Sequence, residues 1–159
     1  MATSIETGTE QLLARQNGGI LTLTMNRPEA RNALSDDLSP ALRAMLARTA
    51  KNDNIGALII TGAGAAFCAG GDIKGMGGKI EKKTMSAEER IADLQQRQRA
   101  LTGVLATLPQ PTIAALPGPA VGAGLAIALA CDIRIAATSV FLSTGYRHVA
   151  LSGDYGISW

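Results

Sequence analysis

The distribution of hydrophobic and polar residues along the chain predicts a series of short strands. Apolar and polar residues alternate over 20–25, as in a half-buried strand, and Gly18 and Gly19 just before it indicate a hairpin turn from residues 12–16. Continuous apolar runs are typical of strands in parallel sheets. Such runs predict strands at 56–61 and 112–116, and a further strand is expected at 132–137.

Helical spacing of apolar residues occurs between these strands. Ser35 is expected to cap the first helix, whose first turn contains Asp36 and Asp37. A capping-box sequence at 86–89 begins a long second helix, and residues 122–130, apolar on all sides, predict a buried third helix. The side chains expected to share one face of the second helix are Ile91, Leu94, Leu101, Leu105 and Leu108. The order of these elements indicates an α/β fold with a parallel sheet.

Length and composition narrow the class of protein. The chain has 159 residues, and we expect a flexible polar segment at 1–10 followed by a single domain over 11–159. Its 15 Lys and Arg residues and 13 Asp and Glu residues give a net charge of +2, too balanced for a nucleic-acid or membrane-surface protein. Because no signal peptide or membrane span is recognisable, a cytoplasmic protein is expected. With two cysteines and one histidine, no metal site is expected.

The glycine-rich segments do not match the common nucleotide-binding motifs. The dinucleotide fingerprint requires Gly or Ala at its third position, where the two candidate loops have Phe67 and Ile127. A phosphate-binding loop requires Ser or Thr after Gly-Lys, whereas Gly78 and Lys79 are followed by Ile80. Nucleotide binding is therefore not expected.

Two glycine-rich turns remain as candidates for a functional site. One follows the predicted strand 56–61, and the other, over 117–124, precedes the predicted buried helix. Parallel strands bring their carboxyl ends to one edge of a sheet, where backbone N–H groups can converge, and a helix N-terminus adds positive potential. Two such N–H groups aimed at one point form an oxyanion hole, for which Gly and Ala are suited. Spacing alone explains these segments equally well as tight turns.

Four segments resemble, in order, the motifs of the crotonase (enoyl-CoA hydratase/isomerase) family: residues 26–35, 67–74, 117–132 and 151–159. The resemblance implies a crotonase-like (ClpP/crotonase) α/β fold, a spiral of ββα units, truncated because the C-terminal helical trimerisation segment of full-length relatives is absent. It also implies an acyl-CoA thioester substrate, with coenzyme A as part of the substrate and no separate cofactor. A homo-oligomer is expected, since the family forms trimers or dimers of trimers.

The same resemblance implies which residues form the site. The backbone N–H groups of Gly71 and Ala123 would stabilise the oxygen of a thioester enolate, because the proton next to a thioester is only weakly acidic. Lys74 could reach a phosphate of the coenzyme, although a lysine in such a loop is commonly solvated. The residues matched to coenzyme A contacts, mostly through their backbone, are Arg31, Ala33, Ala69, Asp72 and Ile73.

The type of reaction depends on the available carboxylates. Hydratases of the family use two glutamates, whose positions match Ala126 and Gly145, so both acid/base groups are absent. Asp154 matches the aspartate used by some isomerases and a dehalogenase, and one carboxylate suffices to move a proton between two carbons. A dehalogenase would have a tryptophan where this chain has Tyr146, which is counted here among the substrate-binding residues. The alternative role for Asp154 is that of a turn former.

Three further residues are expected to be structural. His148 lies where the family has no catalytic residue, Cys68 has no neighbour that would lower its thiol pKa, and Cys131 ends an apolar helix. The sequence thus predicts an enoyl-CoA hydratase/isomerase-type enzyme that isomerises a double bond through Asp154. The alternatives are an enoyl-CoA hydratase and a non-catalytic relative that binds thioesters, or only partners, without turnover.

Overall fold

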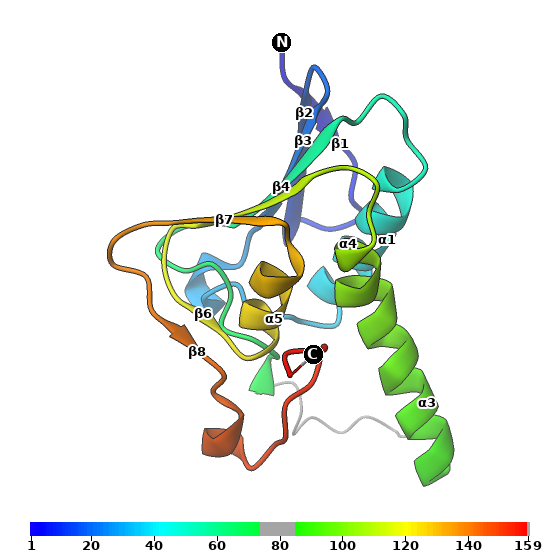
Figure 1. The fold of residues 1–159 in the computed structure, drawn as a ribbon, viewed down its shortest axis with the longest axis vertical. Coiled ribbons are helices and arrows are strands. Elements are labelled where there is room, and N and C mark those ends of the chain that lie inside the picture. Colours follow the sequence, from blue (N-terminus) through cyan, green and yellow to red (C-terminus); the bar gives the residue numbers. More distant parts are fainter. Residues whose placement is uncertain (74–84, 159) are drawn as a thin grey trace.

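The computed structural model describes residues 1–73 and 85–158. Its frame is a six-stranded sheet in the order β1-β2-β3-β4-β5-β7 (Figure 1). The first three strands pair antiparallel, and β3, β4, β5 and β7 pair parallel. The strands of this sheet are β1 (Thr3–Ile5), β2 (Leu12–Asn17), β3 (Ile20–Met25), β4 (Ala57–Gly62), β5 (Thr112–Leu116) and β7 (Ile133–Ala136).

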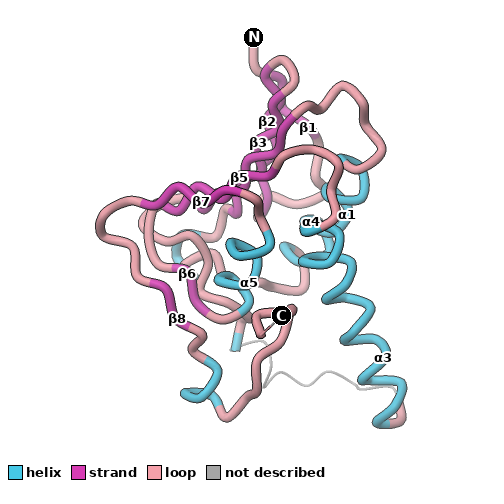
Figure 2. The backbone as a smooth tube through the Cα atoms, viewed as in Figure 1, coloured by secondary structure: helices cyan, strands magenta, loops and turns pink. Residues whose placement is uncertain are grey.

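Helices and a second, two-stranded sheet complete the fold (Figure 2). The short parallel strands β6 (Ala120–Val121) and β8 (Leu142–Ser143) form this second sheet. The α-helices are α1 (Leu38–Thr49), α3 (Ala87–Gln98), α4 (Val104–Ala106) and α5 (Ala123–Ala130), with a π-helical segment η2 (Arg99–Gly103) joining α3 to α4. Two 3₁₀ turns, η1 (Pro28–Ala30) and η3 (Tyr146–Val149), lie in the loops.

The core forms where α1 and α5 pack against the central strands. Strand β4 alternates buried Leu58 and Ile60 with partly buried residues, and its neighbour β3 does the same. Each fully buried leucine or isoleucine contributes about 1.5–3 kcal/mol relative to an exposed one. The largest fully buried side chains of the described residues are Phe67, Leu12, Leu21, Leu23, Met25, Leu38, Leu42, Leu46, Leu58, Ile60, Leu101 and Leu105.

The parallel register determines where the candidate loops lie. Met25 pairs with Gly62 at the ends of β3 and β4, and Thr61 of β4 pairs with Ala115 of β5. The carboxyl ends of these strands therefore lie at one edge of the sheet, and each continues into one of the predicted motifs. This edge brings together residues 26–35, 62–73 and 117–122, which are far apart in the sequence.

Three elements differ from the sequence-based expectation. Residues 1–10, expected to be flexible, contain β1, which pairs with β2 at the sheet edge. Helix α1 begins at Leu38 with Asp37 as its N-cap residue, although the Ser35 hydroxyl still accepts a hydrogen bond of 3.0 Å from the Leu38 N–H. Strand β7 forms as expected at the end of the sheet, but all four of its residues are exposed.

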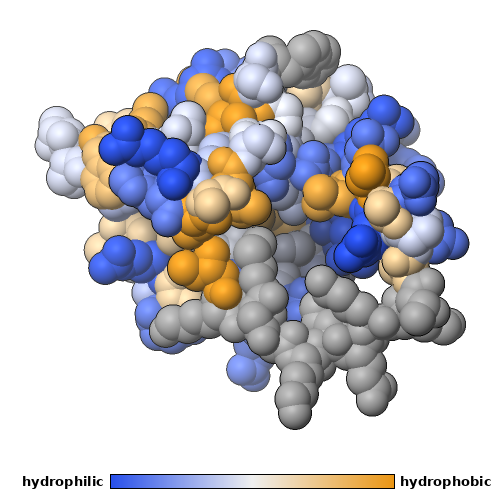
Figure 3. Space-filling view, turned by 90° about the horizontal axis from the view of Figure 1, so that it is seen from below, coloured by the Kyte–Doolittle hydropathy of each residue, from blue (hydrophilic) through white to orange (hydrophobic). Residues whose placement is uncertain are grey.

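Helix α3 has the capping box that the sequence predicts, but its apolar face is only partly covered. Ser86 accepts a hydrogen bond from the Glu89 N–H, and the Glu89 carboxylate accepts one from the Ser86 N–H. No residue of α3 is buried: Ile91 and Leu94 are 57% and 49% exposed, because this helix points away from the sheet (Figure 1). Seen from below, apolar atoms are exposed on the side where α3 lies (Figure 3). The described helices include none that combines the length and the hydropathy needed to cross a membrane.

Candidate functional site

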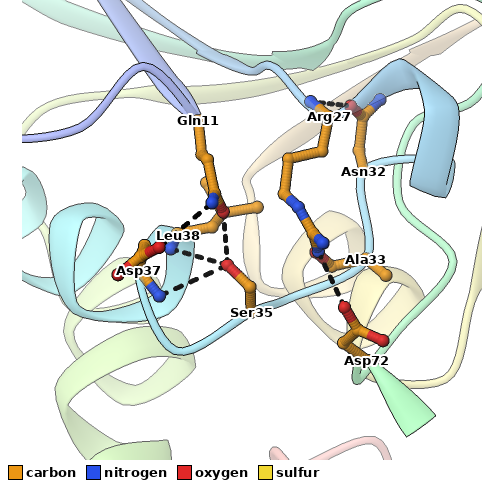
Figure 4. Close-up of polar contacts among 8 residues, drawn as sticks. All are labelled: Gln11, Arg27, Asn32, Ala33, Ser35, Asp37, Leu38 and Asp72. Carbon is orange, nitrogen blue, oxygen red and sulfur yellow. Dashed lines mark hydrogen bonds and ion pairs between the residues drawn. The ribbon is translucent and has the colours of Figure 1, made fainter. Parts of the chain in front are cut away.

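The first glycine loop (residues 62–73) follows β4 and is held by Asn32. This side chain is fully buried, and its amide donates hydrogen bonds of 2.9 Å to the Ala63 carbonyl and 2.8 Å to the Ala66 carbonyl. Its amide oxygen accepts a hydrogen bond of 2.8 Å from the Arg27 N–H (Figure 4). Both the amide nitrogen and the amide oxygen of this buried side chain are therefore hydrogen-bonded. Asn32 thereby fixes the start of the loop relative to the chain that follows β3.

A second contact fixes the other end of the same loop. The Arg27 guanidinium forms a 3.0 Å ion pair with Asp72 and donates a 2.7 Å hydrogen bond to the Ala33 carbonyl. Leu34 donates its N–H to the Gly70 carbonyl at 2.8 Å and accepts the Asp72 N–H at 3.1 Å. The Gly70 carbonyl and the Asp72 N–H thus both face Leu34. In an extended segment the intervening Gly71 N–H therefore points to the opposite side. That N–H donates no hydrogen bond to the described residues.

The second glycine loop (residues 117–122) packs directly on the first. Cys68 donates its N–H to Pro119, and its carbonyl accepts the Val121 N–H at 2.9 Å. Gly70, with φ +92°, lies so close that an added Cβ would be 3.5 Å from the Ala123 nitrogen. Gly124 approaches even more closely, since its Cβ would be 2.3 Å from the Cys68 carbonyl oxygen.

The N-terminus of α5 supplies the second backbone donor. Gly122 precedes this helix with φ 54° and ψ −125°, and no side chain caps it. The first N–H groups of an α-helix have no acceptor within the helix, and they carry its positive dipole end. Ala123 is the first helical residue, so the structure brings its N–H next to the loop that contains Gly71. Such a pair of backbone donors can bind an anionic oxygen.

Asp154 lies beside this second loop and is bound by Tyr146. The Tyr146 hydroxyl donates a 2.6 Å hydrogen bond to Asp154 Oδ1. An added Cβ on Gly122 would be 3.9 Å from one ring carbon of Tyr146, and one on Gly153 would be 4.0 Å from another. The aromatic ring therefore fills the space between the second loop and the segment that contains Asp154.

Burial governs the pKa of both groups in this pair. Partial burial raises the pKa of Asp154 above its ordinary value, while the hydrogen bonds from the Tyr146 hydroxyl and from its own backbone N–H oppose this effect. The pKa of the Tyr146 phenol is raised, first by burial and then by the hydrogen bond to Asp154. Within this pair the tyrosine hydroxyl is the neutral donor and the Asp154 carboxyl oxygen is the acceptor.

The residues matched to coenzyme A contacts gather around the first loop. The Arg31 carbonyl accepts a hydrogen bond of 3.0 Å from the Ala69 N–H. The Ala33 carbonyl and the Asp72 carboxylate both contact the Arg27 guanidinium. Ile73 follows them and is 59% exposed. Lys74 lies outside the described residues, so its predicted contact with a phosphate stays a prediction.

The two positions matched to hydratase glutamates have no acid/base group. Ala126 is buried in α5, and Gly145 has φ +69° at the start of η3. A Cβ on Gly145 would be 2.7 Å from Cγ1 of Val121, so a larger residue there would require this side chain to move and would be strained by the positive φ. Asp154 is the carboxylate that Tyr146 links to the second loop.

The cysteines and the histidine have no reactive arrangement. Burial raises the pKa of the Cys68 and Cys131 thiols to about 12, so both are protonated at neutral pH. His148 is exposed on η3. The part of the chain that the structure describes contains no group of three or more His, Cys, Asp or Glu residues that could hold a metal ion.

Two contributors to the site were not identified from the sequence. Arg27 and Asn32 lie in the first motif, but their contacts with the first loop were not predicted. The available signal was an arginine after β3 and an aspartate in the loop after β4, because these strand ends are adjacent in a parallel sheet. Tyr146 was predicted to bind substrate, and the structure shows that its hydroxyl contacts Asp154.

Comparison with known proteins gives a consistent match. Residues 15–149 match the family model described as enoyl-CoA hydratase/isomerase. A probable enoyl-CoA hydratase of Mycobacterium tuberculosis, EchA14, is 36% identical over 140 residues, which cover 88% of this chain and 52% of that protein. The 1,2-epoxyphenylacetyl-CoA isomerase of Escherichia coli is 36% identical over 150 residues, which cover 94% of this chain and 56% of that protein.

Solved structures agree with these sequence matches. An enoyl-CoA hydratase from Polaromonas sp. JS666 superposes with a TM-score of 0.79 at 36% identity, covering 93% of this chain and 56% of that chain. One from Mycobacterium avium subsp. paratuberculosis gives a TM-score of 0.80 at 27% identity, with 94% and 56% coverage. The chain thus spans about half the length of the relatives it matches, and its α/β fold is that of these proteins.

Proposed function

Because the chain belongs to the enoyl-CoA hydratase/isomerase family, we propose that it binds an acyl-CoA thioester and moves a double bond within the acyl group. The observation that carries this proposal is the Asp154 carboxylate, held by Tyr146 beside the loop that leads to Ala123. The absence of carboxylates at Ala126 and Gly145 supports isomerisation over hydration. The E. coli relative named as an isomerase of an epoxyacyl-CoA supports the same class of reaction.

In this proposal, the thioester carbonyl oxygen accepts hydrogen bonds from the N–H groups of Gly71 and Ala123. Removal of a proton from C2 moves negative charge onto this oxygen, where the two donors and the dipole of α5 stabilise it. Loss of one such donor typically raises the barrier by about 2.7–4 kcal/mol. Gly and Ala fit this role because their small side chains leave room for the substrate.

Asp154 transfers the proton. Its carboxylate takes a proton from C2 of a 3-enoyl thioester, which leaves a dienolate, and the resulting carboxylic acid returns the proton at C4. The product is the conjugated 2-enoyl thioester, and the carboxylate is regenerated. The raised pKa of Asp154 favours this role, since a stronger base holds the proton long enough to deliver it.

The coenzyme A part of the substrate is proposed to bind along the first loop. The candidate contacts, mainly through backbone groups, are Arg31, Ala33, Ala69, Asp72 and Ile73, with Lys74 as a candidate for a phosphate. Coenzyme A is here part of the substrate, and the proton transfer requires no separate cofactor. The proposed setting is the cytoplasm.

Assembly into a homo-oligomer is part of the same proposal. Ile133 and Ile135 of the edge strand β7 are 50% and 61% exposed, and apolar side chains on a sheet edge favour association. Light scattering should therefore detect species larger than a monomer. A monodisperse monomer would contradict this part of the proposal.

The reaction is tested by mixing the protein with a short 3-enoyl-CoA ester and following mass and absorbance. We expect a product of unchanged mass with the absorbance of a conjugated thioester, and no product with Asp154→Asn. Asparagine has the same shape and still accepts the Tyr146 hydrogen bond, so the variant removes the base and keeps the contact. A product heavier by one water would favour hydration, and binding without any product would favour a non-catalytic thioester-binding protein.

A further inference from the structure

Tyr146 is fixed along its whole length. Its carbonyl accepts the Leu151 N–H at 3.1 Å, and its ring lies between Gly122 and Gly153. The hydroxyl at the end of this ring donates to Asp154 at 2.6 Å, the distance expected of a hydrogen bond from a hydroxyl to a charged carboxylate. A rigid side chain thus connects the loop before α5 with the proposed base.

We infer that Tyr146 is the positioning residue of Asp154: its hydroxyl fixes one carboxylate oxygen and leaves the other to exchange the proton with the substrate. This inference rests on the proposed isomerisation and adds a role for a residue other than the base. A carboxylate that moves one proton between two carbons must present the same oxygen to both, so free rotation of the carboxyl group would slow the reaction. The contact of the ring with Gly122 also sets the position of this oxygen relative to the Ala123 N–H.

The hydrogen bond also acts on the charge of Asp154. Burial favours the neutral carboxylic acid, and the Tyr146 hydroxyl is the described side chain that donates to this carboxylate and opposes that effect. The other titratable groups on this segment and the elements around it are Tyr155, Arg43, Arg97, Cys68, Arg147 and His148. Of these, Arg43 of α1, Arg97 of α3 and Cys68 act on the Tyr155 phenol, and Arg147 and His148 are exposed on η3.

Tyr146→Phe is the main test, with Tyr155→Phe as its matched control. Both variants lose one phenolic hydroxyl, from tyrosines on either side of Asp154, but the Tyr155 hydroxyl makes no hydrogen bond to the described residues. The pKa of Asp154 is followed by the NMR shift of its carboxyl carbon, and kcat/KM for the 3-enoyl-CoA ester is measured across pH.

For Tyr146→Phe we expect the pKa of Asp154 to rise and the acid limb of kcat/KM to move to higher pH. At a pH on the acid limb, kcat/KM of Tyr146→Phe should be about tenfold or more below that of the native protein, because a hydrogen bond to a charged group is lost. The loss should be smaller at high pH, where Asp154 is ionised in both proteins, and Tyr155→Phe should leave the pKa of Asp154 in place. An unchanged pKa of Asp154 in Tyr146→Phe, or equal shifts in both variants, would overturn the inference.

A measurement on the native protein covers the case in which Tyr146→Phe does not fold. Proton NMR should detect a downfield hydroxyl proton that is lost in Asp154→Ala, and its absence from the native spectrum would overturn the inference. Failure of the proposed function is distinguishable, because it is seen as turnover retained by Asp154→Asn or as no turnover at all. The NMR titration of Asp154 tests the role of Tyr146 whether or not the protein turns over the ester.

Discussion

Gly124 lies where the two glycine loops meet, and we expect Gly124→Ala to push them apart. The new Cβ would be 2.3 Å from the Cys68 carbonyl oxygen and 2.7 Å from its Cβ. Non-bonded carbon atoms rest about 3.5–4.0 Å apart, so the loops would have to separate by about 1 Å. Overpacking of this kind costs about 1–3 kcal/mol, against about 1 kcal/mol that alanine gains over glycine in a helix. Because the obstructing atom is backbone, the cost should lie in the upper part of this range, which leaves a net destabilisation of about 1–2 kcal/mol.

The same displacement should also lower the rate of isomerisation. It acts on the spacing between the Gly71 and Ala123 N–H groups, and a shift of about 1 Å in a catalytic group can cost about 100-fold in rate. Isomerisation of the 3-enoyl-CoA ester by Gly124→Ala, measured at a temperature where the variant is folded, should show a loss of this order.

Gly103→Ala is the matched control for this substitution. Gly103 also has helical dihedral angles, φ −64° and ψ −46°, but its added Cβ would be 3.6 Å from the nearest atom, the Arg99 Cβ. Urea denaturation should show that Gly103→Ala is more stable than the native protein by about 0.5–1 kcal/mol. If Gly124→Ala were stabilised equally, the close contact between the loops would be refuted.

Two further substitutions test the anchoring of the site. Asn32→Ala removes three hydrogen bonds from a fully buried side chain, so urea denaturation should show a loss of about 3 kcal/mol. Asn26→Ala, which removes one exposed hydrogen bond to Glu10, should cost less than about 1 kcal/mol, and equal losses would contradict the anchoring role of Asn32. The folded state holds the Asp154 proton more tightly than the unfolded state, whose pKa is near 3.8, so ionisation of Asp154 destabilises the fold as pH rises through the raised pKa. The uncharged Asp154→Asn should therefore gain stability relative to the native protein as the pH rises from about 3.8 through the raised pKa, and a difference independent of pH would argue against that shift.

The sequence predicted the parallel part of the sheet well, because short apolar runs bounded by turn residues are typical of buried strands. Strand β5 has the predicted bounds, and β4 and α5 differ from the predicted segments by one residue. The exposure of Ile91 and Leu94 was not predictable in this way. Helical spacing shows that they share a face with Leu101, but not whether another part of the molecule covers it.

The candidate site was predictable where glycine marks a loop and unpredictable where two distant side chains meet. The position after buried strands marked the two glycine-rich loops, and the resemblance to the family motifs assigned Gly71 and Ala123 within them. Tyr146 contacts Asp154 because the chain turns back between them through Ala150, which has φ 54° although it is not a glycine. A left-handed alanine has no sequence signature, so this contact could be found only in the structure.

The two halves of the site therefore depend on different kinds of interaction. The two loops that contain the N–H donors are joined to each other by backbone hydrogen bonds and by glycines in close contact, and the first loop is anchored by the side chains of Arg27 and Asn32. Asp154 depends on one hydroxyl, that of Tyr146. A substitution that removes only the base of Asp154 should then alter the reaction while leaving the binding of the thioester intact. In Asp154→Asn, we expect the affinity for an acyl-CoA to stay within a few-fold while turnover is lost, because the asparagine removes only the proton acceptor.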